Sequence, residues 1–266
     1  MTDKFAKLTT PESPVVDVDC AIVLAGGLGT RLRAAVAGVP KSMAILDGRP
    51  FLEHLMDFWI TQGITRIILA VGYMHDSICE HFGTHYKSAS ISYSIEHSPL
   101  GTGGGLLKAV RQASDKRDIL VLNGDTIFEV TLGNLVQFHR DKESEWTIAL
   151  FSSDKSARHL GVGVDHDGRI IEMQIKLGGL SRVSNGGAYI ICTQMLVNQM
   201  YRDREYSSLE DEILPNLIAS RRRIFGLEFD AVFIDIGIPE DYLRADLLMR
   251  TRRLESSEQD FGRSRK

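Results

Sequence analysis

The feature that most constrains this 266-residue chain is a short stretch near its start, residues 21–32, which reads AIVLAGGLGTRL. Its first four residues are apolar and predict a buried β-strand. The strand runs directly into a loop that contains Gly26, Gly27, Gly29, Thr30 and Arg31. Glycines at a strand end let another group approach the backbone closely, and an arginine fork suits anionic oxygens. The stretch therefore predicts a loop that binds a negatively charged group.

Three kinds of glycine loop follow buried strands, and two of them do not fit. A dinucleotide-binding loop needs the spacing G-x-G-x-x-G, but Leu32 stands where the third glycine belongs. A P-loop needs G-x-x-x-x-G-K-[ST], which is absent. The remaining functional interpretation is a loop whose bare amides line a nucleoside triphosphate. The structural alternative, a plain strand-to-helix turn, stays open for the loop taken by itself.

Apolar strands alternate with amphipathic helices through the first half of the chain. We expect strands at residues 20–24, 66–71, 91–95, 119–122 and 146–151, and helices at 50–62, 75–82, 103–113 and 132–140. Such alternation is typical of a Rossmann-like, doubly wound and mostly parallel sheet. The sequence thus predicts an α/β fold for this half.

After residue 152 the pattern changes to short strands, beginning with a hairpin in which residues 161–164 and 170–174 flank DHDGR. Further strands are expected at 188–192, 224–227 and 232–234, and helices at 209–218 and 239–250. We therefore expect a loose leader over residues 1–18, a single domain over 19–252 and a polar tail over 253–266. Within the domain, a nucleotide half (about 19–152) would carry an added β-rich lobe (about 153–235).

Bulk properties exclude several classes of protein. The net charge of −4 gives no bias towards nucleic acid, and no apolar run approaches the roughly 20 residues that span a bilayer. The N-terminus lacks a signal-peptide core, and three widely separated cysteines fit neither a disulfide framework nor a zinc site. We therefore expect a cytoplasmic protein whose three cysteines are reduced thiols. His54, His81 and His139 lie in predicted helices and are expected on the surface.

Pro40 and Lys41 add weight to the nucleotide interpretation. The pattern GLGTRL…VPK resembles the signature of the sugar-1-phosphate nucleotidyltransferases, also called sugar-nucleotide pyrophosphorylases, with Ser42 where many relatives have proline. Lys41 alone would read as a surface lysine. Five further stretches follow in the family's order: EHSPLGTGGG, VLNGDT, EMQIK, NGGAY and FIDIGIPEDY. In EMQIK, Ile175 replaces a glutamate usual in relatives, so that match is weaker. The resemblance covers about residues 19–250 and implies the nucleotide-diphospho-sugar transferase fold.

The resemblance also implies roles for individual residues. The nucleotide would be bound by Leu24, Ala25, Gly26, Gly27, Gly29, Thr30, Arg31, Lys41, Glu96, Gly101 and Thr102. The sugar phosphate would be bound by Gly124, Lys176, Asn185 and Gly186. Arg31, Lys41 and Asp125 would be catalytic, and Asp125 and Asp235 would hold Mg²⁺. Taken alone, each aspartate could equally be a helix cap or a turn residue.

The implied reaction is attack by a sugar 1-phosphate oxygen on the α-phosphorus of a nucleoside triphosphate. A phosphate monoester is largely dianionic at pH 7, because its second pKa is about 6, so no side chain needs to deprotonate it. Mg²⁺, Arg31 and Lys41 would offset repulsion between the anions and stabilise the departing pyrophosphate. Lys176 would contact the sugar phosphate.

Glu96 bears on the choice of base, because UTP- and dTTP-using relatives commonly have glutamine there. A carboxylate can accept both N1–H and N2–H₂ of guanine, so Glu96 favours GTP; a solvated strand-end carboxylate is the alternative. The chain most resembles the short D-glycero-α-D-manno-heptose 1-phosphate guanylyltransferases, which make GDP-heptose for surface polysaccharides such as capsule. Mannose-1-phosphate guanylyltransferases and UTP- or dTTP-using relatives are alternatives. A non-catalytic sugar-nucleotide sensor is a further alternative function. The chain could also form a homo-oligomer.

Overall fold

The computed structural model describes residues 17–27, 29, 32, 36, 38–152, 161–175, 183–199 and 206–263. Its main strands are β1 (Cys20–Leu24), β4 (Arg66–Val71), β6 (Ala89–Ile95), β7 (Asp118–Asn123), β9 (Trp146–Ser152), β10 (Gly161–Val164), β11 (Ile170–Ile175), β12 (Val183–Cys192) and β13 (Ile224–Glu228). The shorter strands are β2 (Ile45–Leu46), β3 (Arg49–Pro50), β5 (His85–Tyr86), β8 (Thr126–Phe128) and β14 (Phe233–Asp235). Helices are α1 (Phe51–Ile60), α2 (His75–Phe82), α3 (Gly101–Ala109), α4 (Leu132–Asp141), α5 (Thr193–Gln199), α6 (Leu214–Ala219) and α7 (Pro239–Arg263), with single turns η1 (Lys41–Met43), η2 (Val110–Ala113) and η3 (Leu209–Ile213).

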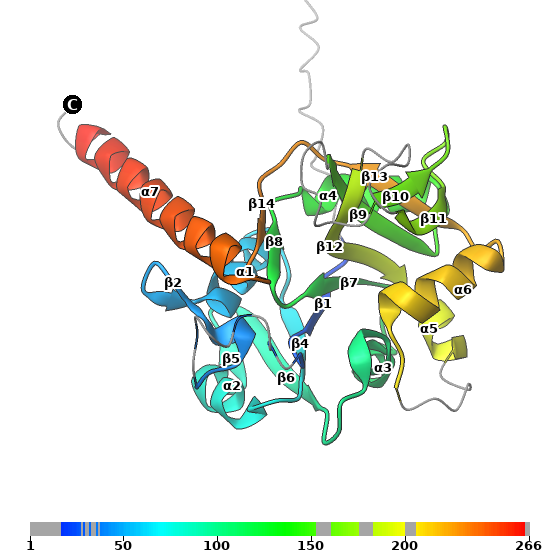
Figure 1. Cartoon of the computed structure of the whole chain (residues 1–266), viewed down its shortest axis with the longest axis horizontal. Coiled ribbons are helices and arrows are strands. Elements are labelled where there is room, and N and C mark those ends of the chain that lie inside the picture. The colour runs from blue at the N-terminus through cyan, green and yellow to red at the C-terminus, as the bar shows by residue number, and fades with distance from the viewer. Residues whose placement is uncertain are drawn as a thin grey trace, which may run out of the picture.

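One ten-stranded sheet runs through the centre of the molecule (Figure 1). Strands β7, β1, β4 and β6 are parallel neighbours in that order, which is the doubly wound core expected from the sequence. The parallel, helix-covered part of the predicted fold is confirmed. Because parallel strands point the same way, the loops after β1, β6 and β7 emerge at one edge of the sheet.

The later part of the chain joins the same sheet in antiparallel fashion through β12. The second half of β12 pairs with β7, and its first two residues pair with β10. On its other side β12 pairs with β9, with a register shift between Asn185 and Tyr189. The predicted hairpin around DHDGR is present as β10 and β11. The short strands β8 and β14 form a separate antiparallel pair.

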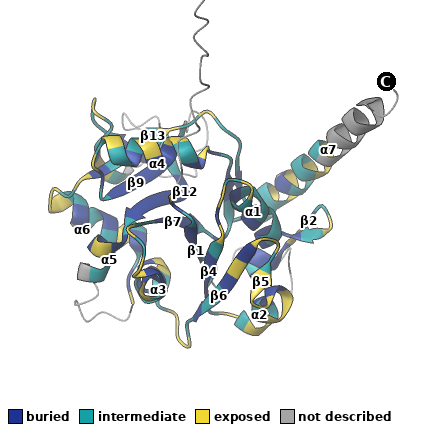
Figure 2. Cartoon of the chain, turned by 180° about the vertical axis from the view of Figure 1, so that it is seen from behind, coloured by how far each residue is buried: buried dark blue, intermediate teal, exposed yellow. Residues whose placement is uncertain are grey.

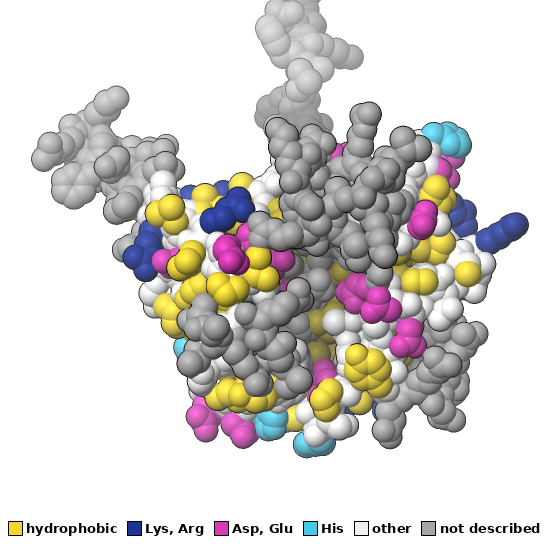
Figure 3. All heavy atoms as spheres, viewed as in Figure 1, with side chains coloured by type: hydrophobic (Ala, Val, Ile, Leu, Met, Phe, Trp, Pro, Cys, Tyr) yellow, Lys and Arg dark blue, Asp and Glu magenta, His cyan; other side chains and the backbone are white. Residues whose placement is uncertain are grey.

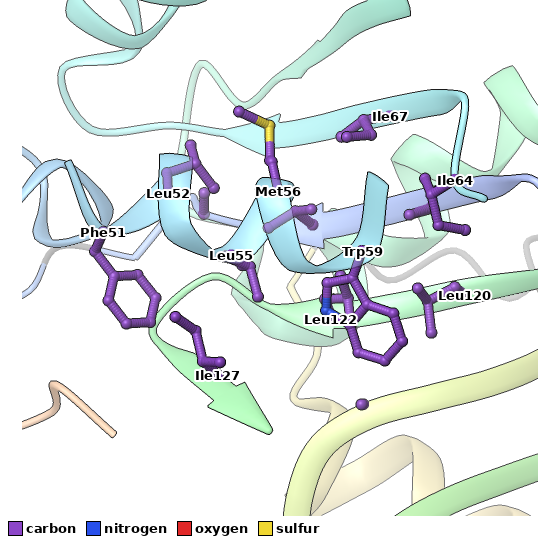
Figure 4. Close-up of a cluster of buried hydrophobic side chains, with 14 of the residues drawn as sticks. Phe51, Leu52, Leu55, Met56, Trp59, Ile64, Ile67, Leu120, Leu122 and Ile127 are labelled. Carbon is purple, nitrogen blue, oxygen red and sulfur yellow. The ribbon is translucent and has the colours of Figure 1, made fainter. Parts of the chain in front are cut away.

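The central strands are buried along most of their length (Figure 2). Their alternating side chains give each face of the sheet its own core. Val23, Leu69 and Leu122 pack on one face, together with the apolar side of α1, whose buried side chains are Phe51, Leu52, Leu55, Met56 and Trp59 (Figure 4). On the opposite face, Ile22 and Val121 pack with α3, α5 and α6.

Three details differ from the sequence prediction. The helix expected at 239–250 continues as α7 to Arg263, into the expected tail, and it extends away from the body (Figure 1). Helix α5 was not anticipated, and neither were strands β2, β3, β5 and β8, because strands of two or three residues carry no periodicity. His139 is only 3% exposed, so its predicted surface position is wrong: Thr147 on β9 provides a polar partner for its ring nitrogen at 2.8 Å. No helix in the described part of the chain is long and apolar enough to cross a membrane.

Candidate active site

A cavity of about 480 Å³ opens at the carboxyl edge of the parallel strands. Ligands of open α/β sheets bind at this edge. The face that carries the cavity is hollowed between the two halves of the molecule (Figure 3). The cavity is lined by Leu24, Ala25, Gly26, Gly27, Lys41, Ser42, Glu96, Pro99, Gly101, Thr102, Gly105, Asn123, Gly124, Asp125, Tyr206, Ser208, Glu210 and Asp211. Ten of the residues implicated by the sequence therefore lie around one space: Leu24, Ala25, Gly26, Gly27, Lys41, Glu96, Gly101, Thr102, Gly124 and Asp125.

The glycine loop enters this cavity directly after β1. The amide of Ala25 donates to Ala70 O on β4 at 2.8 Å, so the start of the loop continues the sheet. Gly29 has a φ of 58°, and a β-carbon there would lie 2.9 Å from Cβ of Lys41. At Gly27, by contrast, a β-carbon would meet nothing within 4 Å. The loop is thus packed at Gly29 and open to a ligand at Gly27. Thr30 and Arg31 lie outside the described residues.

The predicted phosphate-binding lysine and the predicted metal-binding aspartate contact each other. Lys41 begins the turn η1, and its Nζ lies 2.5 Å from Oδ2 of Asp125, which follows β7. The Lys41 side chain is 13% exposed and the Asp125 side chain 39%. The ion pair therefore leaves the carboxylate open towards the cavity while the lysine is held close to the glycine loop.

Asp235, the second predicted metal ligand, is brought next to Asp125 by the pairing of β14 with β8. Asp235 lies opposite Thr126, and the amide of Ile236 donates to Asp125 O at 3.1 Å. Oδ1 of Asp235 accepts a hydrogen bond from Gly237 N at 2.6 Å. Among the described residues, no three His, Cys, Asp or Glu side chains gather as a metal-binding group. Two carboxylates nevertheless fit Mg²⁺, which usually completes its coordination with water and phosphate oxygens.

Glu96 follows β6 and is packed between the glycine loop and α3. A β-carbon at Gly26 would lie 2.7 Å from Glu96 Oε1, and one at Gly105 would lie 2.6 Å from the same oxygen. Its other oxygen accepts a hydrogen bond from Leu100 N at 3.1 Å. Burial raises the pKa of Glu96, against the lowering influence of the Leu100 amide and of Lys108. Glu96 is thus a half-buried carboxylate within the site.

The sequence analysis missed one wall of the cavity, the segment from Tyr206 to Ile213. Ser207 O accepts hydrogen bonds from the amides of Gly103 at 2.9 Å and Gly104 at 3.3 Å, and Ser207 N donates to Leu100 O at 2.9 Å. A β-carbon at Gly101, where φ is 73°, would lie 2.4 Å from Ser207 O. The glycines of the PLGTGGG stretch are therefore needed to dock this segment on α3.

The only sequence signal in this missed segment is local. Ser208 accepts a hydrogen bond from Asp211 N at 3.0 Å, an ordinary helix N-cap. That pattern predicts where a helix begins, and it carries no information about which cavity the helix faces.

The predicted sugar-binding residues of the later lobe are set apart from the cavity lining. Asn185 and Gly186 are on β12 and do not line the cavity. Asn185 Nδ2 donates to the Tyr189 hydroxyl at 2.8 Å, and that hydroxyl also hydrogen-bonds the side chain of Asn123, which does line it. Asn185 is therefore linked to the cavity through Tyr189 and Asn123. Lys176 lies outside the described residues.

The fold and the site together define a nucleotidyltransferase, and the chain belongs to the nucleotidyl transferase family, which matches residues 20–252. It is 38% identical over 228 residues to D-glycero-alpha-D-manno-heptose 1-phosphate guanylyltransferase of Aneurinibacillus thermoaerophilus, covering 85% of this chain and 96% of that protein. It is 31% identical to mannose-1-phosphate guanyltransferase beta-B of Xenopus laevis, covering 84% of this chain and 62% of that protein.

Among solved structures, the chain is similar to HddC from Yersinia pseudotuberculosis complexed with GMP-PN. The TM-score is 0.76 at 30% sequence identity, and the match covers 87% of this chain and 100% of that one. The resemblance inferred from the motifs is confirmed at the level of the family, and so is the fold class.

Proposed function

We propose that this protein transfers GMP from GTP to D-glycero-α-D-manno-heptose 1-phosphate and releases pyrophosphate. The observation that carries the proposal is the meeting of the glycine loop, the Lys41–Asp125 pair and Glu96 around one cavity. A triphosphate needs backbone amides and a cation, which the glycine loop and Lys41 would supply. Guanine needs a pair of acceptors, which Glu96 would supply. The heptose sugar is favoured over mannose by sequence identity, which is 38% to the heptose enzyme and 31% to the mannose enzyme.

The chemistry is a substitution at phosphorus. An oxygen of the sugar 1-phosphate forms a bond to the α-phosphorus of GTP, and the bond from that phosphorus to the bridging oxygen of the β-phosphate breaks. Pyrophosphate leaves with the electron pair. The nucleophile is already ionised near pH 7, which agrees with the proposal that the residues of this site position and neutralise rather than remove a proton.

Lys41 and Arg31 would bind the phosphates from the glycine-loop side. Lys41 is held by Asp125 and by its packing against Gly29, so its ammonium is oriented before substrate arrives. Preorganised charge of this kind stabilises charge that develops in a transition state. Asp125 and Asp235 would hold Mg²⁺, which when bound would neutralise phosphate charge and stabilise the leaving group.

Glu96 would select guanine. Its carboxylate can accept from the two adjacent N–H groups of guanine, whereas the base of UTP offers one N–H between two carbonyls. A buried mismatch of hydrogen bonds can exclude the wrong substrate by roughly 10⁴-fold. The product would be GDP-heptose, made in the cytoplasm and used for surface polysaccharide such as capsule. A complex of several copies of the chain is compatible with this proposal.

The test is pyrophosphate release with Mg²⁺, measured for GTP, ATP, UTP and dTTP against heptose, mannose and glucose 1-phosphates. We expect the highest kcat/KM for GTP with heptose 1-phosphate. Glu96→Gln should lower the activity with GTP and should narrow the preference for GTP over the other three triphosphates. A preference of the wild type for UTP or dTTP would overturn the guanylyl assignment, and no release with any pair would favour a non-catalytic sensor.

A further inference from the structure

Glu210 is one of four acidic side chains that line the cavity, together with Glu96, Asp125 and Asp211. It lies on the wall formed by residues 206–213, and Thr102 Oγ1 donates to its Oε2 at 2.9 Å. The same threonine oxygen accepts from Leu209 N at 2.9 Å, so the hydroxyl proton is directed at Glu210. One oxygen of the carboxylate is thereby oriented by the fold.

The charge of Glu210 acts on Tyr189, a fully buried residue of β12. Burial is the largest cause that raises the pKa of Tyr189, and the charges of Glu210 and Asp125 raise it further. Both carboxylates therefore lie near the Tyr189 hydroxyl, which Asn123 and Asn185 hydrogen-bond. The amide oxygen of Asn123 is itself buried and has no hydrogen-bond partner within the described part of the chain.

Lys41 is the single lysine or arginine among the described residues that line the cavity. Lys41 and the glycine loop lie on one side, and Glu210 lies on the wall built by residues 206–213. A phosphate placed against Glu210 would be repelled, because like charges at short range disfavour each other. A hydroxyl placed there would donate a hydrogen bond to the carboxylate, and hydrogen bonds to charged groups are the stronger ones.

We propose that Glu210 determines sugar binding by accepting a hydrogen bond from a ring hydroxyl of the sugar 1-phosphate. The proposal rests on the proposed function and adds a residue that the motifs did not indicate. Thr102 is the positioning residue, because it orients the carboxylate from the start of α3. Glu210 also keeps phosphates on the Lys41 side by repulsion, so the sugar phosphate is oriented by both sides of the cavity.

The experiment compares wild type, Glu210→Gln and the matched control Glu228→Gln, which removes an exposed carboxylate at the end of β13. The probes are mannose 1-phosphate, whose ring hydroxyls at C2, C3 and C4 are those of the heptose, and its three monodeoxy analogues. We expect Glu210→Gln to raise KM for the sugar phosphate roughly tenfold or more, with KM for GTP changed less than about twofold. Glu228→Gln should match the wild type.

A deoxy analogue separates a direct contact from a structural effect. Removing the contacted hydroxyl should raise the wild-type KM about tenfold and change the KM of Glu210→Gln less than twofold, because the two changes remove one interaction. Glu210→Asp, which retracts the charge, should also raise KM for the sugar phosphate. If every deoxy analogue raised the KM equally in the wild type and in Glu210→Gln, the proposal would be overturned.

Ribose is the other source of hydroxyls. If Glu210→Gln raises the KM for GTP but leaves the KM for 2′-deoxy- or 3′-deoxy-GTP unchanged, Glu210 contacts the nucleotide and the proposal is wrong. Calorimetric binding of the sugar phosphate to wild type and Glu210→Gln provides a readout independent of turnover. If the wild type releases no pyrophosphate with any substrate pair, the proposed function fails, while equal binding to the two proteins would refute the role of Glu210 itself.

Discussion

The two walls of the cavity are built in different ways. The first wall, made of the glycine loop, Lys41 and Asp125, uses backbone and charge. The glycine loop follows β1, Asp125 follows β7, and Lys41 begins the turn η1. The second wall, Tyr206 to Ile213, is docked on α3 by hydrogen bonds to Ser207 and by the absence of side chains at Gly101 and Gly103. We therefore expect the first wall to carry the proposed chemistry, whereas the second depends on close packing. Substitutions in the first should affect turnover, and substitutions in the second should affect stability as well.

The largest effect is expected from the carboxylate of the first wall. Asp125→Asn should lower kcat by roughly 10³-fold or more, because several kcal/mol of charge stabilisation at the phosphates would be lost. Its midpoint of thermal unfolding should stay near that of the wild type. Pyrophosphate release across a range of Mg²⁺ concentrations measures this, with the exposed Asp230→Asn as control. A near-normal rate would remove Asp125 from the proposed metal site.

Lys41→Ala should have the next largest effect. It removes a cation from beside the phosphates, where one contact is worth on the order of 3 kcal/mol, or about 10²-fold in rate. The matched control is Arg117→Ala, since the Arg117 side chain is 86% exposed. If the two variants were equally active, the Lys41–Asp125 pair would be only a structural ion pair.

The packing of the second wall can be tested by replacing two glycines, one packed and one open, with alanine. Gly101→Ala should lower the free energy of unfolding by about 2 kcal/mol, because its β-carbon would overlap Ser207 O and its backbone is left-handed. Gly27→Ala, where space is open, should change it by less than about 0.5 kcal/mol. Denaturant unfolding compares the two. Equal losses would mean that the 206–213 segment is not tightly docked on α3.

The smallest effect concerns Glu96, which lies between the walls. Burial raises its pKa above the usual 4.5, so the folded protein binds this proton more tightly than the unfolded chain does. The wild type should therefore lose stability relative to Glu96→Gln as pH rises from about 4 through the raised pKa, and the difference should then level off. Denaturant unfolding of both proteins at several pH values measures this. A wild type that gains stability relative to Glu96→Gln with rising pH would contradict the inferred shift.

Sequence by itself determined the parts of the protein that repeat a local pattern. Apolar runs of four to six residues predicted β1, β4 and β7, since a strand buried on both faces must be continuously apolar. The glycine loop was also found in the sequence, because its chemistry is carried by residue types at short spacing. The family resemblance added Lys41, Glu96, Asp125 and Asp235, for which spacing alone offered no reason to meet.

Tertiary structure alone decided which distant residues share the cavity. Lys41 and Asp125 are 84 residues apart, and only the order of strands in the sheet brings them within 2.5 Å. The glycines at 101 and 103 looked like part of a binding turn, yet their small size serves the docking of Ser207. Glu210 followed from no motif, because a capped helix has the same local pattern whichever surface it faces. Local patterns report on neighbours along the chain, whereas an active site of this kind is assembled from contacts that only the packed sheet creates.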